Sequence, residues 1–109
     1  YRARSAYKLI EEFYDVDKQI SKNDFDAIEK YIQANDQYEL YDELFKLAVQ
    51  EHPGTILPSY YKGRYFEGIG EFKKAIGTYR SAYNMNDLEG LTKNDLQTLA
   101  DEIEADSNY

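Results

Sequence analysis

The feature that most limits what this chain can fold into is a repeat of side-chain character at a spacing of 34 residues. Aromatic residues, alanines and cations recur at that interval, within stretches whose apolar residues follow the period of a helix. The paired positions are Tyr31 and Tyr65, Ile32 and Phe66, Tyr38 and Phe72, Phe45 and Tyr79, Ala48 and Ala82, and Lys30 and Arg64. A period of this length indicates two copies of one helical unit that stack to bury a common core.

Turn signals separate the helical stretches. His52-Pro53-Gly54 ends one helix, because the residue before proline avoids helical dihedrals and glycine permits a left-handed turn. Pro58 suits the first turn of the next helix, where its missing N–H removes no hydrogen bond. Thr92 and Asp95 have the spacing of a capping box at the start of a last helix. The sequence therefore predicts an all-α fold of about six antiparallel helices.

We expect these helices to form a single domain over 1–109. A leading helix over 1–20 precedes a first helical hairpin over 23–53, which is followed by a second hairpin over 56–86 and a capping helix over 91–105. The leading helix carries an apolar stripe that we predict to be a docking face for a neighbouring domain. Its residues are Leu9, Ile10, Phe13 and Tyr14.

Residues 63–82 resemble a tetratricopeptide repeat. Gly63 stands where that family has a small residue between paired helices, and Gly70 stands at its turn. Ala75, Tyr79 and Ala82 match the small, aromatic and small positions of its second helix. The resemblance implies a right-handed stack of antiparallel helical hairpins with a non-catalytic role in protein interaction or scaffolding.

The first copy of the repeat departs from the family pattern. Glu29 stands at the small position and Tyr41 at the first alanine position, although Phe45, Ala48 and Pro53 do match. The match to the family therefore depends on the second copy and on the common period.

A second resemblance concerns a longer segment. Residues 63–82, followed by the stretch 90–96, look like the carboxy-terminal helical extension of some bacterial α/β-hydrolase-like esterases. This resemblance implies that the parent protein is a hydrolase whose catalytic residues lie in a preceding domain. The first residue is Tyr1, which favours a fragment or a processed form. An alternative function is thus a contribution to the edge of an esterase substrate site.

The tetratricopeptide resemblance also implies a peptide groove along the first helix of each hairpin. On this chain the groove would comprise Asp26, Lys30, Gln33, Tyr60, Arg64 and Glu67. Lys30 and Arg64 would hold a carboxylate, and Tyr60 would offer a stacking platform. The sequence favours a plainer interpretation, in which the tyrosines are core and rim aromatics and the cations balance nearby acids.

Composition and charge exclude several classes of function. A net charge of −8 opposes binding to nucleic acids and anionic membranes, and no apolar run has the length of a membrane span. The chain has no cysteine, and its single histidine, His52, is at a helix end that favours a cation. We therefore expect no catalytic residue, cofactor or metal in this chain, and a protein or peptide partner. The compartment stays open.

Overall fold

The computed structural model describes residues 22–88 and 90–107, and the regular elements of this part of the chain are all helices. The elements are α2 (Lys22–Ala34), η1 (Tyr38–Leu40), α3 (Tyr41–Glu51), α4 (Leu57–Gly68), α5 (Phe72–Ser81), η2 (Ala82–Asn84) and α6 (Lys93–Ser107), where η denotes a short 3₁₀ turn. Two isolated β-bridges join loops, and no strand occurs in the described part of the chain. The predicted all-α fold is confirmed, whereas the leading helix over 1–20 and its docking face lie outside the described residues.

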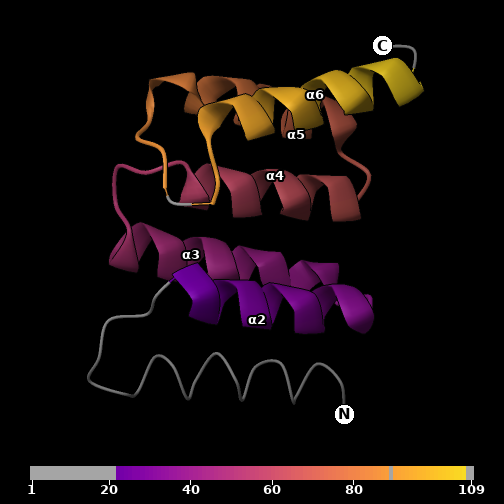
Figure 1. The fold of residues 1–109 in the computed structure, drawn as a ribbon. Coiled ribbons are helices and arrows are strands. Elements are labelled where there is room, and N and C mark those ends of the chain that lie inside the picture. The colour runs from indigo at the N-terminus through magenta and orange to yellow at the C-terminus, as the bar shows by residue number, and fades with distance from the viewer. Residues whose placement is uncertain (1–21, 89, 108–109) are drawn as a thin grey trace.

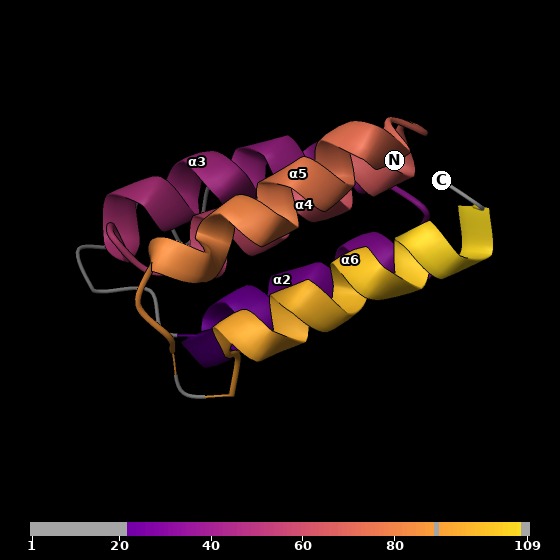
Figure 2. The ribbon, with the colours of Figure 1, turned by 90° about the horizontal axis from the view of Figure 1, so that it is seen from above.

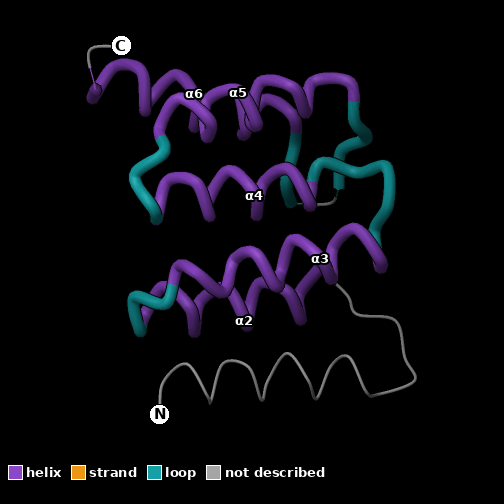
Figure 3. The backbone as a smooth tube through the Cα atoms, turned by 180° about the vertical axis from the view of Figure 1, so that it is seen from behind, coloured by secondary structure: helices purple, strands orange, loops and turns teal. Residues whose placement is uncertain are grey.

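The helices lie in layers. In Figure 1, α2 and α3 occupy the lower layer, α4 lies above them, and α5 and α6 form the upper layer. Helix α4 packs against both α3 and α5, and α5 packs against α6. Figure 2 shows that α6 overlies α2 in projection, while α5 overlies α4. Figure 3 follows the short connections between these helices from behind.

The predicted turn signals act where the sequence places them. Helix α3 ends at Glu51, and His52 is its C-terminal cap, with its ring in edge contact with Phe25 at 5.7 Å. Gly54 and Gly70 have φ of 78° and 82°, which only glycine adopts without strain. Pro58 lies in the first turn of α4, as predicted.

The capping box of α6 is also confirmed. The Thr92 N–H donates to Asp95 Oδ2 at 2.9 Å, and the Asp95 N–H donates to Thr92 Oγ1 at 3.3 Å. Leu91 and Leu96 flank the box and are both buried. Arg80 adds ion pairs from α5 to Asp101 and Glu104 of α6.

One continuous core joins the layers. Its largest buried side chains are Phe25, Ile28, Ile32, Leu40, Tyr41, Leu44, Ile56, Leu57, Tyr61, Tyr79 and Leu96. Two of the six pairs related by the 34-residue spacing share their burial: Ala48 and Ala82 are both fully buried, and Tyr31 and Tyr65 are both half-buried. The members of the other four pairs differ in burial, as Phe45 (half-buried) and Tyr79 (fully buried) do. The loops after α3 and η2 are also joined, because the Ile56 N–H donates to the Asn86 carbonyl at 2.9 Å.

Candidate functional site

The six predicted groove residues lie on α2 and α4, and the structure connects some of them. Tyr60, Arg64 and Glu67 of α4 form one bonded cluster: Arg64 Nε donates to the Tyr60 hydroxyl, and Arg64 Nη1 pairs with Glu67 Oε2, both at 3.4 Å. The Arg64 guanidinium also lies 5.4 Å from the centre of the Tyr60 ring.

The three residues from α2 have other surroundings. Asp26 pairs with Lys22 at 2.7 Å within the same helix. Lys30 is exposed, and no ion pair or hydrogen bond joins it to another described residue. Gln33 donates to the Tyr41 hydroxyl at 3.0 Å. No described contact therefore joins Lys30 to Arg64, the pair that we expected to hold one carboxylate.

A residue that we did not predict, Glu29, connects the two helices. Its Oε2 accepts the hydroxyl of Tyr60 at 2.5 Å and the hydroxyl of Tyr41 at 2.9 Å. Gln33 Nε2 also donates to Glu29 Oε2, at 3.4 Å. The Glu29 side chain is buried, and a buried carboxylate without donors would be costly, so these hydrogen bonds stabilise it there.

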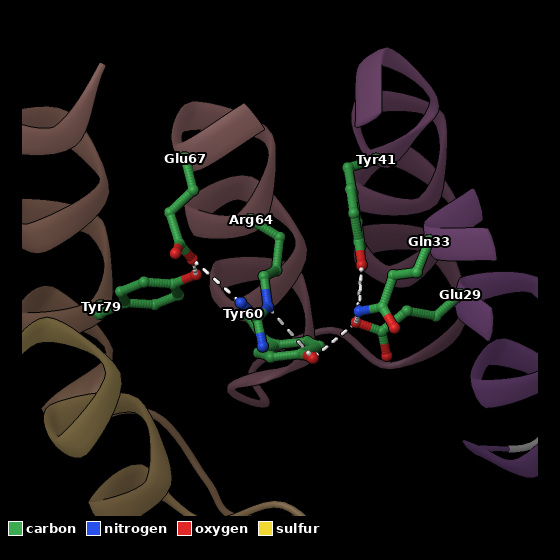
Figure 4. A network of polar contacts seen from close by, with 7 residues as sticks. All are labelled: Glu29, Gln33, Tyr41, Tyr60, Arg64, Glu67 and Tyr79. Atoms are coloured by element: carbon green, nitrogen blue, oxygen red, sulfur yellow. Dashed lines mark hydrogen bonds and ion pairs between the residues drawn. The ribbon is translucent and has the colours of Figure 1, made fainter. Parts of the chain in front are cut away.

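The contacts form a continuous polar chain across four helices (Figure 4). It begins at Tyr79 of α5 and continues through Glu67, Arg64 and Tyr60 of α4. The Tyr60 hydroxyl then donates to Glu29 of α2, which also accepts the hydroxyl of Tyr41 from α3. Gln33 of α2 donates to that Tyr41 hydroxyl and is the last member. We name these seven residues the polar chain. Each carboxylate in it receives at least two donors, so both are hydrogen-bonded within the protein, and Arg64 places a positive charge beside Glu67.

The tyrosines of the polar chain stay protonated. Burial, followed by the Glu29 carboxylate, raises the pKa of Tyr60 to about 12. The same two causes raise the pKa of Tyr41, and burial together with the hydrogen bond to Glu67 raises that of Tyr79. These hydroxyls therefore donate to carboxylates at neutral pH, and the hydrogen bonds join neighbouring helices.

A surface hollow of about 370 Å³ opens beside the polar chain. We name it the Arg64 hollow; its lining residues are Tyr38, Arg64, Glu67, Gly68 and Phe72. Phe72 is 37% exposed, and Tyr38 is half-buried at the start of η1. The hollow thus combines two aromatic walls with one arginine–glutamate pair.

Two signals in the sequence could have revealed these features. Glu29 lies on the buried stripe of α2 that also holds Phe25, Ile28 and Ile32, and an acid at such a position requires donors from a neighbouring element. Tyr38 and Phe72 are one of the pairs related by the 34-residue spacing. Tyr38 and Phe72 border the same hollow because of tertiary packing, which the 34-residue spacing alone does not predict.

Three further observations concern the described residues as a whole. No group of three potential metal ligands lies together in this part of the chain. None of the described helices combines the length and the apolar character that crossing a membrane requires. No protein-family model, curated protein or solved structure matches the chain at a significant level.

Proposed function

We propose that this chain is a non-catalytic, tetratricopeptide-like interaction domain that binds an extended segment of a partner protein at the Arg64 hollow. The observation that carries the proposal is the hollow itself, because three residues of the predicted groove cluster beside it or in its wall. They are Tyr60, Arg64 and Glu67, and the last two line it. The polar chain holds them in place from three neighbouring helices.

The lining suits a peptide rather than a small ion. Tyr38 and Phe72 offer apolar surface for one side chain, and exposed aromatic walls are typical anchors in protein interfaces. The Arg64 guanidinium has five N–H donors, and its described contacts use Nε and one N–H on Nη1. The remaining donors suit a peptide carbonyl, so one extended segment can use both the apolar walls and the cation.

The hairpin stack belongs to the same proposal. Equal burial at Ala48 and Ala82 supports two related units, because both alanines occupy close-packed positions. In such a stack, α2 and α4 would be the first helices of the two hairpins and would carry the binding face. A domain of this kind would recruit a partner to an attached catalytic domain, and the relation to bacterial esterases stays a prediction.

Peptide selection tests this function. Random peptides displayed on phage are selected against the folded chain, and the affinities of enriched peptides are measured for wild type, Phe72→Ala and Tyr83→Ala. Both aromatics are exposed, but only Phe72 lines the hollow, so Tyr83→Ala is the matched control. We expect Phe72→Ala to weaken binding about tenfold and Tyr83→Ala to leave it unchanged.

The arginine gives a second arm of the same test. Arg64→Lys keeps the charge but loses the planar donor fork, so it should weaken the same peptides while the helix content stays constant. Peptides that bind both variants as tightly as wild type would place the interaction elsewhere and overturn the proposal. The proposal would also be overturned if the selection enriched no peptide that binds wild type more tightly than it binds Phe72→Ala.

A further inference from the structure

A second cluster lies between α3 and α4 and contains a lysine surrounded by rings. Lys62 Nζ lies 4.9 Å from the centre of the Phe45 ring, 5.4 Å from that of Phe66 and 5.5 Å from that of Tyr65. The same ammonium donates to Asp42 Oδ1 at 3.3 Å. Three aromatic rings and one carboxylate therefore lie around the Lys62 ammonium. Lys74 Nζ also lies 5.9 Å from the centre of the Phe66 ring, and Lys46 pairs with Asp42 at 3.6 Å.

The rings and the lysine differ in how they are held. Phe45, Tyr65 and Phe66 are half-buried and pack against the core. The Lys62 side chain is 31% exposed, and it reaches the rings on a flexible four-carbon stem. Lys62 can therefore leave the cluster by rotation of its own side chain while the three rings keep their places.

The chemistry of the cluster favours one kind of ligand. A cation within about 6 Å of a ring centre is attracted by the ring face, and several rings act together. A primary ammonium is strongly hydrated and loses water on entering such a site. A methylated ammonium binds its water less tightly, so it gains more from the same rings, and Asp42 supplies the compensating charge.

We propose that Phe45, Tyr65, Phe66 and Asp42 form a cage for a methylated ammonium group, which Lys62 fills from within the chain. The Lys62 ammonium occupies the position that the methylated ammonium of a ligand would take. A methylated lysine of a partner protein and a free quaternary ammonium compound share this chemistry. The cage shares no residue with the Arg64 hollow, so the inference does not depend on the proposed function.

The test compares wild type with Lys62→Ala by NMR on the isotope-labelled chain. Each is titrated with choline, with a trimethyllysine peptide, with the same peptide unmethylated, and with the neutral isostere of choline that carries a tert-butyl group. We expect Lys62→Ala to bind choline about tenfold more tightly than wild type, since the internal competitor is gone. The shifts should concentrate on the aromatic resonances of Phe45 and Phe66.

Control variants distinguish cation binding by the rings from nonspecific binding to an apolar surface. Phe66→Leu in the Lys62→Ala background keeps apolar volume but removes a ring, and it should abolish the gain. Lys62→Gln, which keeps an unbranched stem with good helix propensity, repeats the comparison if Lys62→Ala unfolds. Tighter binding of the trimethyllysine peptide than of choline would identify a partner protein as the source, and the reverse would identify a small molecule.

Two results would overturn the inference. One is equal shifts from choline and its neutral isostere, which would make the contact hydrophobic and independent of charge. The other is the absence of any shift at Phe45 and Phe66 in both lysine variants at millimolar choline, with helix content retained.

Discussion

The Cα of Gly63 lies so close to the ring of Tyr79 that a Cβ at position 63 would stand 2.1 Å from Tyr79 Cε1. Tyr79 is fully buried and its hydroxyl donates to Glu67, so the ring cannot turn aside without losing that hydrogen bond. The glycine is therefore required by the approach of α4 to α5. No turn is involved, since Gly63 lies inside α4.

Gly63→Ala should consequently lower the free energy of unfolding by about 1–3 kcal/mol, because an extra methyl group overpacks the contact. The matched control is Gly77→Ala in α5, where nothing lies within 4 Å of the added carbon. That change should raise the free energy of unfolding by about 0.5–1 kcal/mol through helix propensity. Urea denaturation of the two variants measures the difference, and equal effects would contradict the close approach.

Local chemistry explains why much of the fold could be predicted. The helix end at His52, the proline in the first turn of α4 and the capping box at Thr92 each depend on residues within a few positions of one another. The small residue at Gly63 could be anticipated as well, since the family resemblance assigns it to a close contact between helices. These features can be predicted because they depend on residues close together in the sequence or on a repeated pattern.

The polar chain could not be predicted in the same way. Glu29 and Tyr60 are hydrogen-bonded although they lie on different helices, and in the sequence Glu29 differs from the family pattern only by standing where a small residue is expected. Its partners depend on how α2 and α3 meet α4, and helical periodicity specifies a buried face without specifying its neighbour. For the same reason, the expectation that Lys30 and Arg64 would hold one carboxylate did not specify that Arg64 pairs with Glu67 of its own helix.

Three fully buried tyrosines allow the loss of a hydroxyl group to be compared with and without a hydrogen-bond partner. The hydroxyls of Tyr41 and Tyr79 donate to carboxylates, whereas the hydroxyl of Tyr61 has no hydrogen-bond partner among the described residues. Tyr41→Phe and Tyr79→Phe should each lower the free energy of unfolding by about 1.5–3 kcal/mol, since each removes a hydrogen bond to a charged group. Tyr61→Phe should be neutral or stabilising, because it removes an unsatisfied polar atom.

Chemical denaturation at neutral pH measures all three phenylalanine variants under one condition. The expected order places Tyr61→Phe at or above wild type and the other two below it. A loss for Tyr61→Phe as large as that for Tyr41→Phe would mean that the Tyr61 hydroxyl has a partner beyond the described residues.

The tyrosines also predict the response to alkaline pH. The pKa of Tyr60 is raised to about 12 in the folded state, whereas an unfolded tyrosine ionises near its ordinary value of 10.0. Between these two values the unfolded chain binds fewer protons than the folded one. The free energy of unfolding should therefore be unaffected by this group below pH 10 and should fall as the pH rises from about 10 to 12.

The raised pKa values of Tyr41, Tyr61 and Tyr79 act in the same direction. Urea denaturation across this pH range, with phenolate absorbance recorded in parallel, measures the effect. Tyr60→Phe should show a shallower decline than wild type, since one of the linked ionisations is gone. A free energy of unfolding that stays constant up to pH 12 would contradict the raised pKa of Tyr60 in the folded state.

The start of α6 offers a final test of local chemistry. Thr92→Ala removes the side-chain acceptor for the Asp95 N–H, so it should lower the free energy of unfolding by about 1 kcal/mol. Thr98→Ala is the matched control, because Thr98 is exposed within the same helix and its replacement should stabilise α6 by a few tenths of a kcal/mol. Hydrogen exchange of the first-turn amides distinguishes the two: Thr92→Ala should accelerate exchange at Asp95, and Thr98→Ala should leave it unchanged. Unchanged exchange at Asp95 in Thr92→Ala would mean that the capping box does not hold the first turn of α6.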